Sequence, residues 1–329
     1  MIVHYSVKKL FGIKHLFLKI SLLFILIALV VRPDKLMDSC YKGLLLFAVN
    51  VLPALLPFFF FSKILTSLNF ADDLGRLLGK PFIKLYGVPP CASYVFSMSV
   101  ISGYPIGAKL ISDLYKSGSI TRNEAKTITA FCSTSGPMFI LGSVGAAMLN
   151  NKSFAIVIYT AHCLSAFLNG FLYRNKKNVP HVVASIPCAK KIDSVLSESI
   201  YSSVISVLTV GAYVGIFYML ADLFVSLGII SFIVKPFGFI APNVLTSGIA
   251  EGLIEMTRGC YVLSKSALTE ILVIPALTGI ITVGGLSVTL QSMTFLKEIG
   301  IKTSFYIATK TTQTLIAVTL SFIFTLIFF

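Results

Sequence analysis

The sequence predicts an all-α polytopic membrane protein with about seven spanning helices and two re-entrant hairpins. Of its 329 residues, 56% are hydrophobic and only 12% are charged, a balance that soluble globular domains do not have. The mean hydropathy is +0.90. Apolar runs close to the length of a spanning helix recur along the whole chain. The predicted spans are 16–31, 43–68, 127–149, 153–173, 203–230, 268–296 and 304–329.

The first predicted element, within residues 1–40, is an N-terminal tail followed by a transmembrane helix. Four lysines precede an apolar run that ends at Val31. The sequence "VVRPDK" follows, without the small residues of a cleavage site, so we expect an uncleaved helix. Because basic residues favour the cytoplasmic side of a membrane, we expect the N-terminus in the cytoplasm.

The distribution of basic residues predicts that segment 92–112 enters the membrane and returns on the same side. If this segment crossed fully, the lysines and arginine between Lys109 and Lys126 would lie outside, against the positive-inside rule. The motif "SGYPIG" at 102–107 supplies the glycines and proline that a sharp turn needs. A kinked spanning helix with glycines packed on its neighbours is the alternative.

The second half of the chain repeats this order of elements, with a second re-entrant segment at 244–263. Ser102, Gly103 and Gly107 match Ser247, Gly248 and Gly252 at a spacing of 145 residues. Gly136 and Gly142 match Gly279 and Gly285 at a spacing of 143. The charge rule gives the two halves opposite orientations. We therefore predict one repeat at 41–175, a cytoplasmic linker at 176–200 and an inverted repeat at 201–329.

Inverted repeats with interrupted helices at matching positions are typical of secondary transporters, whose substrate site lies near the membrane midplane. The N-termini of half-helices there suit an anionic ligand. The predicted substrate-binding residues are Ser102, Gly103, Tyr104, Gly107, Ser133, Thr134, Ser135, Gly136, Ser247, Gly248, Glu251, Gly252, Glu255, Thr278, Gly279 and Gln291. Helix packing is the alternative role of the glycines, and the hydroxyl groups could bond back to the helix backbone instead.

The ionisable residues within the predicted spans and hairpins leave several roles open. Glu251 and Glu255 could bind a coupling proton or sodium ion, pair with Arg258, or lie in water near the outer surface. Lys109 and Arg258 could neutralise a substrate anion or extend their charged ends to the interface. We expect His162 to bond another helix, and Lys310 to face a cavity or lie near the inner interface. Neither a metal site nor a cofactor is predicted, because the cysteines show no ligand spacing.

Three segments carry a resemblance to a known family: "VLPALLPFFFFSKIL" (51–65), "SGYPIGAKLISDLYKSGSITRNEAKTITAFCSTSGPMFILGSVGAAML" (102–149) and "SGIAEGLIEMTRG" (247–259). They resemble the YlbJ-type sporulation integral membrane proteins, over roughly 40–325. The resemblance implies a nucleoside-recognition (Gate) domain and a plan similar to concentrative nucleoside transporters. It also implies a protein of the outer forespore membrane that moves dipicolinic acid from the mother cell toward the forespore.

The expected function is therefore transport of a small organic anion, dipicolinate by resemblance, across a lipid bilayer. A coupling proton or sodium ion and a homo-oligomer are left open, and no nucleic-acid partner is expected. The alternatives are a transporter of nucleosides or other small solutes, and a membrane protein of spore maturation that transports nothing. An enzyme is not expected, because the chain has no zinc motif or nucleophile–base set of recognisable spacing.

Overall fold

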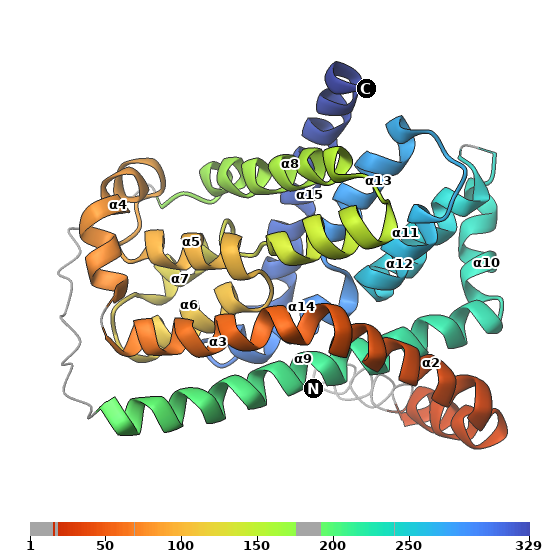
Figure 1. Cartoon of the computed structure of the whole chain (residues 1–329), viewed down its shortest axis with the longest axis horizontal. Coiled ribbons are helices and arrows are strands. Elements are labelled where there is room, and N and C mark those ends of the chain that lie inside the picture. The colour runs from red at the N-terminus through yellow and green to blue at the C-terminus, as the bar shows by residue number, and fades with distance from the viewer. Residues whose placement is uncertain (1–15, 17–18, 69, 176–191, 240) are drawn as a thin grey trace, which may run out of the picture.

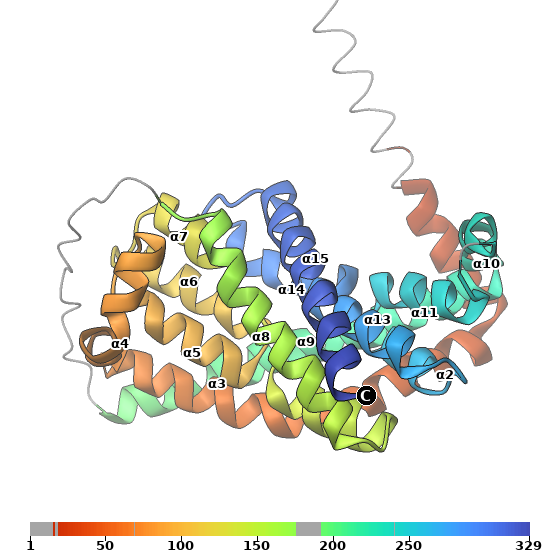
Figure 2. The same ribbon diagram turned by 90° about the horizontal axis from the view of Figure 1, so that it is seen from above.

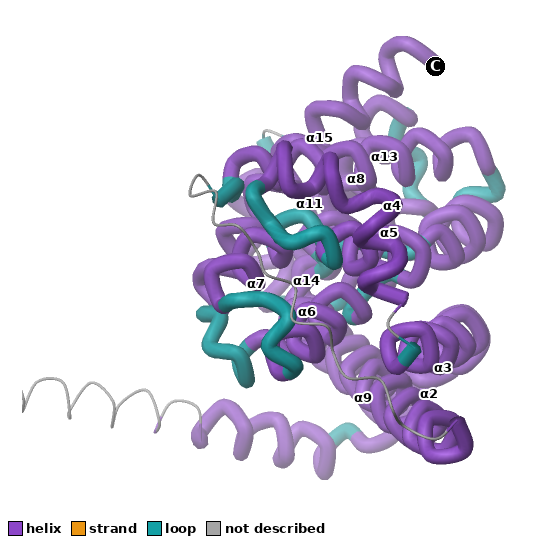
Figure 3. The backbone as a smooth tube through the Cα atoms, turned by 90° about the vertical axis from the view of Figure 1, so that its left-hand side faces the viewer, coloured by secondary structure: helices purple, strands orange, loops and turns teal. Residues whose placement is uncertain are grey.

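The computed structural model describes residues 16, 19–68, 70–175, 192–239 and 241–329, and the elements within these ranges are helices joined by turns and loops (Figure 3). A helix over Lys19–Val31 comes first. It is followed by α2 (Pro33–Leu46), η1 (Phe47–Val51), α3 (Leu52–Ser67), α4 (Phe70–Tyr86), α5 (Ala92–Ser102), α6 (Ile106–Lys116), α7 (Arg122–Thr129), η2 (Met138–Met148), α8 (Lys152–Leu172), α9 (Ile192–Ser226), α10 (Ile229–Val234), η3 (Lys235–Phe237), α11 (Asn243–Ile254), α12 (Met256–Ser264), α13 (Glu270–Val283), α14 (Gly285–Leu296) and α15 (Thr303–Phe328).

Four stretches of helix in the described residues are long and apolar enough to cross a membrane. They are Lys152–Leu172, Val195–Ser226, Glu270–Leu296 and Thr303–Phe328. Many large apolar side chains on these helices are exposed, as expected for surfaces that face lipid. Together with the shorter apolar helices, they confirm a helical membrane protein. The number of spans, their orientation and the inverted repeat stay predictions.

Segment 92–112 forms a helical hairpin, here called hairpin 1, in which α5 and α6 are antiparallel arms. A Cβ atom placed on Gly107 of α6 would lie 2.9 Å from Oγ of Ser99 in α5, which a continuous helix would hold well apart. The turn at the tip runs through Gly103 and Tyr104 to Pro105, with a cis bond between the last two residues. The predicted turn is confirmed in its position and its residues.

The second hairpin, here called hairpin 2, consists of α11 and α12, and it turns at Glu255. The φ and ψ angles of Glu255 are −136° and 113°, which interrupts the helix at a single extended residue. The two arms touch where Gly259 of α12 lies against Gly252 and Gly248 of α11, since a Cβ on Gly259 would be 2.3 Å from Cα of Gly252. Small residues here let two backbones approach closely.

Each half also contains an interrupted helix. Between Thr129 and Met138 the chain leaves the helix, and we call this segment break 1. The glycine pair Gly284–Gly285, both with positive φ, separates α13 from α14, and we call it break 2. Figures 1 and 2 show α5–α7 toward one end of the molecule and α10–α12 toward the other, with α9 running along the length of both groups.

The end of the predicted linker 176–200 changes. Helix α9 begins at Ile192, so the end of the predicted linker belongs to a helix, whereas 176–191 lies outside the described residues. The N-terminal tail before residue 16 also lies outside them. The N-terminal part of α9 lies beside α3, where Lys63 forms an ion pair with Glu198 (Figure 1).

Candidate functional site

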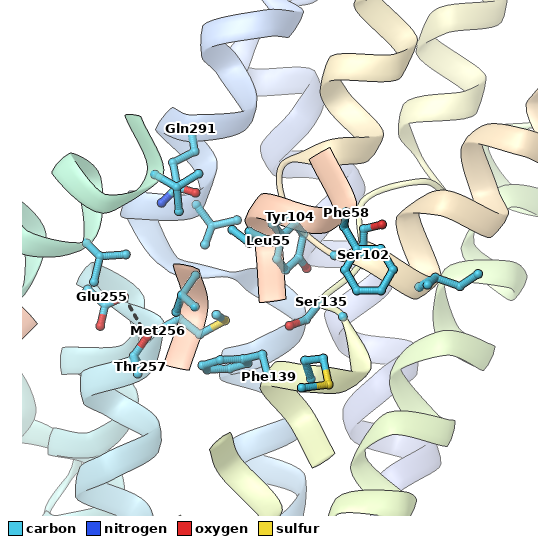
Figure 4. A pocket seen from close by; sticks show the side chains of 18 residues that line it. Leu55, Phe58, Ser102, Tyr104, Ser135, Phe139, Glu255, Met256, Thr257 and Gln291 are labelled. Atoms are coloured by element: carbon cyan, nitrogen blue, oxygen red, sulfur yellow. Dashed lines mark hydrogen bonds between the residues drawn. The ribbon is translucent and has the colours of Figure 1, made fainter. Parts of the chain in front are cut away.

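A cavity lies where the two hairpin tips meet break 1 and α14, the helix that follows break 2. Its empty volume is about 660 Å³, counted out to its open mouth, and helices α3 and α9 close its sides. The predicted residues that line it are Ser102, Gly103, Tyr104, Ser135, Gly136, Glu255 and Gln291. The structure thus brings residues from both halves of the chain to one site (Figure 4).

The sequence prediction did not include most of the cavity's apolar wall. The added lining residues are Val51, Leu55, Phe58, Ile101, Met138, Phe139, Val210, Val214, Met256, Thr257 and Val288. Those on η1, α3 and α9 lie in uniformly apolar spans, where no signal separates a cavity-facing side chain from a lipid-facing one. Met256 and Thr257 directly follow Glu255, so a sequence prediction that placed the turn at Glu255 would have identified both as lining residues.

One buried hydroxyl group in the cavity wall has no hydrogen-bond partner among the described residues. The Oγ atom of Ser102, at the tip of hairpin 1, makes no hydrogen bond although the residue is only 6% exposed. The Gln291 side chain, on α14, also lines the cavity and is 3% exposed. Buried polar groups are normally paired, so unpaired ones that face a cavity indicate a place for a ligand.

Glu255 is the charged side chain that lines the cavity among the described residues. It is 1% exposed and caps α12, since its carboxylate accepts hydrogen bonds from the backbone N–H of Arg258 (2.8 Å) and the hydroxyl of Thr257 (3.2 Å). A carboxylate is stabilised at this position because the first N–H groups of a helix have no partner within the helix.

Arg258 joins the two arms of hairpin 2 to each other and to α9. Its guanidinium donates to Glu251 on α11 (2.6 Å) and to Asp222 on α9 (2.9 Å). Asp222 in turn accepts from Ser39 on α2 (2.6 Å). The predicted alternative that Glu251 pairs with Arg258 is therefore the one observed, and Glu251 does not line the cavity.

Replacing Arg258 with glutamine is expected to destabilise the protein by about 2 kcal/mol, because two carboxylates would then face each other without a counter-ion. The side chains of Arg258, Glu251 and Asp222 are 14%, 8% and 19% exposed. The matched control is Lys116→Gln, which breaks an exposed pair with Glu298 and should change stability by less than about 0.5 kcal/mol. Thermal unfolding in detergent measures both variants, and equal shifts would contradict the prediction.

A second cluster of polar side chains is buried between hairpin 1, break 1 and α15. The ammonium of Lys310, on α15, donates to the Tyr104 hydroxyl (2.7 Å), the Ser133 carbonyl (2.8 Å) and Oε1 of Gln313 (3.0 Å). The Tyr104 hydroxyl donates to the carbonyl of Thr282 (3.1 Å). Lys310 thus ties the tip of hairpin 1 to break 1, a role that its sequence position alone does not indicate.

His162, on α8, joins the two breaks within the same enclosed region. Its Nε2 accepts from the backbone N–H of Ser135 (2.8 Å), and its Nδ1 lies 2.8 Å from the hydroxyl of Thr282. Because Nε2 is an acceptor, Nδ1 carries the proton and donates to Thr282. The expected helix-to-helix bond of His162 is therefore present, and it holds break 1 close to the end of α13.

Two predicted hydroxyl groups of break 1 bond within the protein instead of facing the cavity. The Ser133 hydroxyl lies 2.8 Å from that of Tyr306, and the Thr134 hydroxyl lies 2.9 Å from that of Ser99. Gly107 packs on break 1, since a Cβ there would overlap the carbonyl oxygen of Cys132. These residues shape the site without lining it.

The predicted position of the second tip requires a correction. Ser247, Gly248 and Gly252 lie within α11 and not at the turn, which is at Glu255. Gly248 and Gly252 pack against Leu263 and Ile280, respectively. The match at 145 residues aligned Gly103, which turns the chain in hairpin 1, with Gly248, which allows close packing in hairpin 2.

Thr278 and Gly279 also lie away from the cavity. They are inside α13, where the Thr278 hydroxyl donates to the carbonyl of Ile274 (2.8 Å) and Gly279 faces Val318 of α15. The interruption of this span is instead at Gly284–Gly285, six residues further along the chain from Thr278 (284 − 278 = 6). Of the predicted partners in the second half, Glu255 and Gln291 reach the cavity.

Lys109 lies outside the central cavity and has partners of its own. Its ammonium donates to Ser202 (3.0 Å) and Ser206 (2.9 Å) on α9 and lies over the Phe59 ring. A small separate pocket contains Lys109 together with Lys63 and Asp113. Neither Lys109 nor Arg258 therefore lines the cavity to neutralise a ligand there.

The chain is similar to a known sporulation protein over most of its length. It is 27% identical over 307 residues to the sporulation integral membrane protein YlbJ of Bacillus subtilis (strain 168), a match that covers 85% of this chain and 75% of the relative. The chain is therefore related to a sporulation integral membrane protein. The predicted YlbJ-type resemblance is confirmed. No protein-family model matches the chain, so its Gate domain stays an implication of the resemblance.

Proposed function

We propose that this protein is a membrane transporter, and not an enzyme or a scaffold, whose solute binds in the central cavity. The observation that carries the proposal is that both hairpin tips and break 1 meet α14, the helix after break 2, at one cavity that contains the unpaired hydroxyl of Ser102. Interrupted helices that converge on a cavity are the usual substrate site of secondary transporters. A protein that only supports an assembly has no need for irregular backbone at this depth.

Alternating access follows if the two hairpins belong to halves of opposite orientation, as the charge pattern predicts. Movement of either hairpin tip would then open the cavity toward one side of the membrane. By family resemblance, the membrane is the outer forespore membrane and the net movement is from the mother cell toward the forespore.

The proposed solute is dipicolinate, a flat aromatic ring with two carboxylates. The apolar walls formed by residues such as Phe58, Met138 and Phe139 suit the two faces of a ring. The hydroxyl of Ser102 and the amide of Gln291 can donate hydrogen bonds to carboxylate oxygens. Among the described residues, no lysine or arginine lines the cavity, so these neutral donors would bind the solute.

A nucleoside is the second candidate solute. The combination of Glu255, Gln291 and hydroxyl groups, in a cavity without a lining cation among the described residues, offers both donors and acceptors to a neutral solute. Such a set suits ribose hydroxyls and the edge of a base. The two candidates differ in charge, and a flux measurement separates them.

The test is flux into liposomes that contain the purified protein, with dipicolinate and uridine as alternative solutes. We expect saturable dipicolinate flux and a rise of about tenfold in KM for Ser102→Ala and for Gln291→Leu, about the value of one lost hydrogen bond. Ser304→Ala, an exposed serine on α15, is the control and should behave as wild type.

The other possible results of the flux experiment lead to different conclusions. Uridine flux without dipicolinate flux would replace the solute and keep the transporter. Flux of neither solute by correctly folded protein would contradict the transport proposal. Normal kinetics of both cavity variants, with flux present, would place the solute site elsewhere.

A further inference from the structure

Glu255 is a buried carboxylate in the cavity wall without an ion-pair partner among the described residues. The nearest cationic side chain on its own helix, Arg258, directs its guanidinium to Glu251 and Asp222 instead. The backbone N–H of Arg258 and the hydroxyl of Thr257 are the groups that bond the Glu255 carboxylate. The end of α12 and one hydroxyl therefore stabilise its charge directly, and the Arg258 guanidinium acts on it only through space.

The titratable groups around Glu255 add no further positive charge. Cys260 and Arg258 lie on α12, Glu251 lies on α11, and Tyr218 and Asp222 lie on α9. The single positive charge of Arg258 already faces two carboxylates. Helix α14 and break 1 contribute the neutral side chains of Gln291 and Ser135 to the same cavity (Figure 4).

Glu255 also occupies the position where a solute anion would bind most favourably. Its carboxylate accepts from the N-terminus of α12, which would otherwise be free to bind an anion. An independent sign of a ligand is the unpaired hydroxyl of Ser102, which lines the same cavity from the opposite hairpin tip. A solute carboxylate bound between the two tips would therefore lie near Glu255.

Two carboxylates that share an enclosed site do not both stay ionised, since their mutual repulsion favours the uptake of one proton. We infer that Glu255 binds a proton whenever a carboxylate solute occupies the cavity, so that the protein moves the solute together with a proton. This inference rests on the proposed function. The proton joins a Glu255 carboxylate oxygen from the side on which the solute enters. It leaves on the side where the solute is released.

Protonated Glu255 has a favourable geometry for this role. One of its oxygens can continue to accept from the N–H of Arg258, while the new O–H group donates to a solute carboxylate. Protonation thus changes Glu255 from a group that repels a solute carboxylate into one that donates a hydrogen bond to it. Because dipicolinate is a dianion at neutral pH, the proton must come from the solution and not from the solute.

The experiment is a binding titration of dipicolinate into the purified wild-type protein at pH 7, in weak buffer with a pH-sensitive dye. We expect the uptake of about one proton per dipicolinate bound. Glu255→Gln, which resembles the protonated acid in shape, should take up almost no protons when it binds dipicolinate. The control Glu298→Gln, at an exposed position, should take up protons as wild type does.

A second measurement needs no variant. If one proton is taken up on binding, the Kd of wild-type protein for dipicolinate should rise about tenfold between pH 7 and pH 8. Binding without proton uptake, or uptake that Glu255→Gln does not reduce, would overturn the inference and leave transport intact. A folded wild-type protein that does not bind dipicolinate would overturn the proposed solute and, with it, this inference.

Discussion

Replacing Gly103 with alanine is expected to abolish transport and to destabilise the protein by about 4 kcal/mol. The φ and ψ angles of Gly103 are 84° and −169°, a region of backbone conformation that only glycine adopts readily. A Cβ atom would also lie 2.3 Å from the backbone nitrogen of Gly136. Strain at positive φ costs roughly 1–2 kcal/mol, and overlap with fixed backbone adds about 1–3 kcal/mol.

The control for this variant is Gly118→Ala, in the turn after α6. Gly118 also has a positive φ, 78°, but a Cβ there meets no atom within 4 Å. The expected destabilisation is therefore only about 1 kcal/mol, with normal flux. Thermal unfolding in detergent and flux in liposomes measure both effects. Similar behaviour of the two variants would show that close contact between hairpin 1 and break 1 is unimportant.

Replacing Lys310 with methionine is expected to reduce flux at least about 100-fold while changing stability by no more than about 1 kcal/mol. The loss of flux follows because the ammonium ties Tyr104 at the tip of hairpin 1 to Ser133 in break 1. Stability is expected to change little because methionine removes the cost of burying a charge, which offsets the lost hydrogen bonds. A buried lysine kept at such a cost is a functional candidate.

Lys302→Met is the matched control, because Lys302 is exposed at the start of the same helix and makes no side-chain capping bond. It should leave both flux and stability at wild-type values. Normal flux through Lys310→Met would show that the tie is not needed for transport. A large loss of folded protein would instead assign Lys310 a structural role.

The local signals in the sequence were strongest where one physical cause dominates. Length and continuity of apolar segments predict the spans, because lipid forces the backbone to pair within each helix. The motif around Gly103 and Pro105 predicts the first tip, since both residues interrupt a helix in any environment. Likewise, Ser135 and Gly136 marked break 1, where several polar and helix-breaking residues follow one another.

The second hairpin shows where a local signal is ambiguous. Glycine favours both a turn and the close contact of two helices, and the sequence does not distinguish these roles. In α11, Gly248 and Gly252 allow close contact with neighbouring helices. The chain turns instead at Glu255, whose side chain caps the next helix. A residue that usually favours helix thus marks the break, because its carboxylate satisfies the N–H groups that the break leaves free.

The sequence by itself determined that this protein is helical, lies in a membrane and interrupts its helices at defined places, because these properties follow from neighbouring residues. Only the tertiary structure decided which residues meet. It placed Phe58 and Val214 in the cavity wall, paired Arg258 with Glu251 and Asp222, and left Glu255 without a counter-ion among the described residues. Contacts between helices far apart in the chain depend on packing and on the pairing of buried polar groups, and neither is encoded in local sequence.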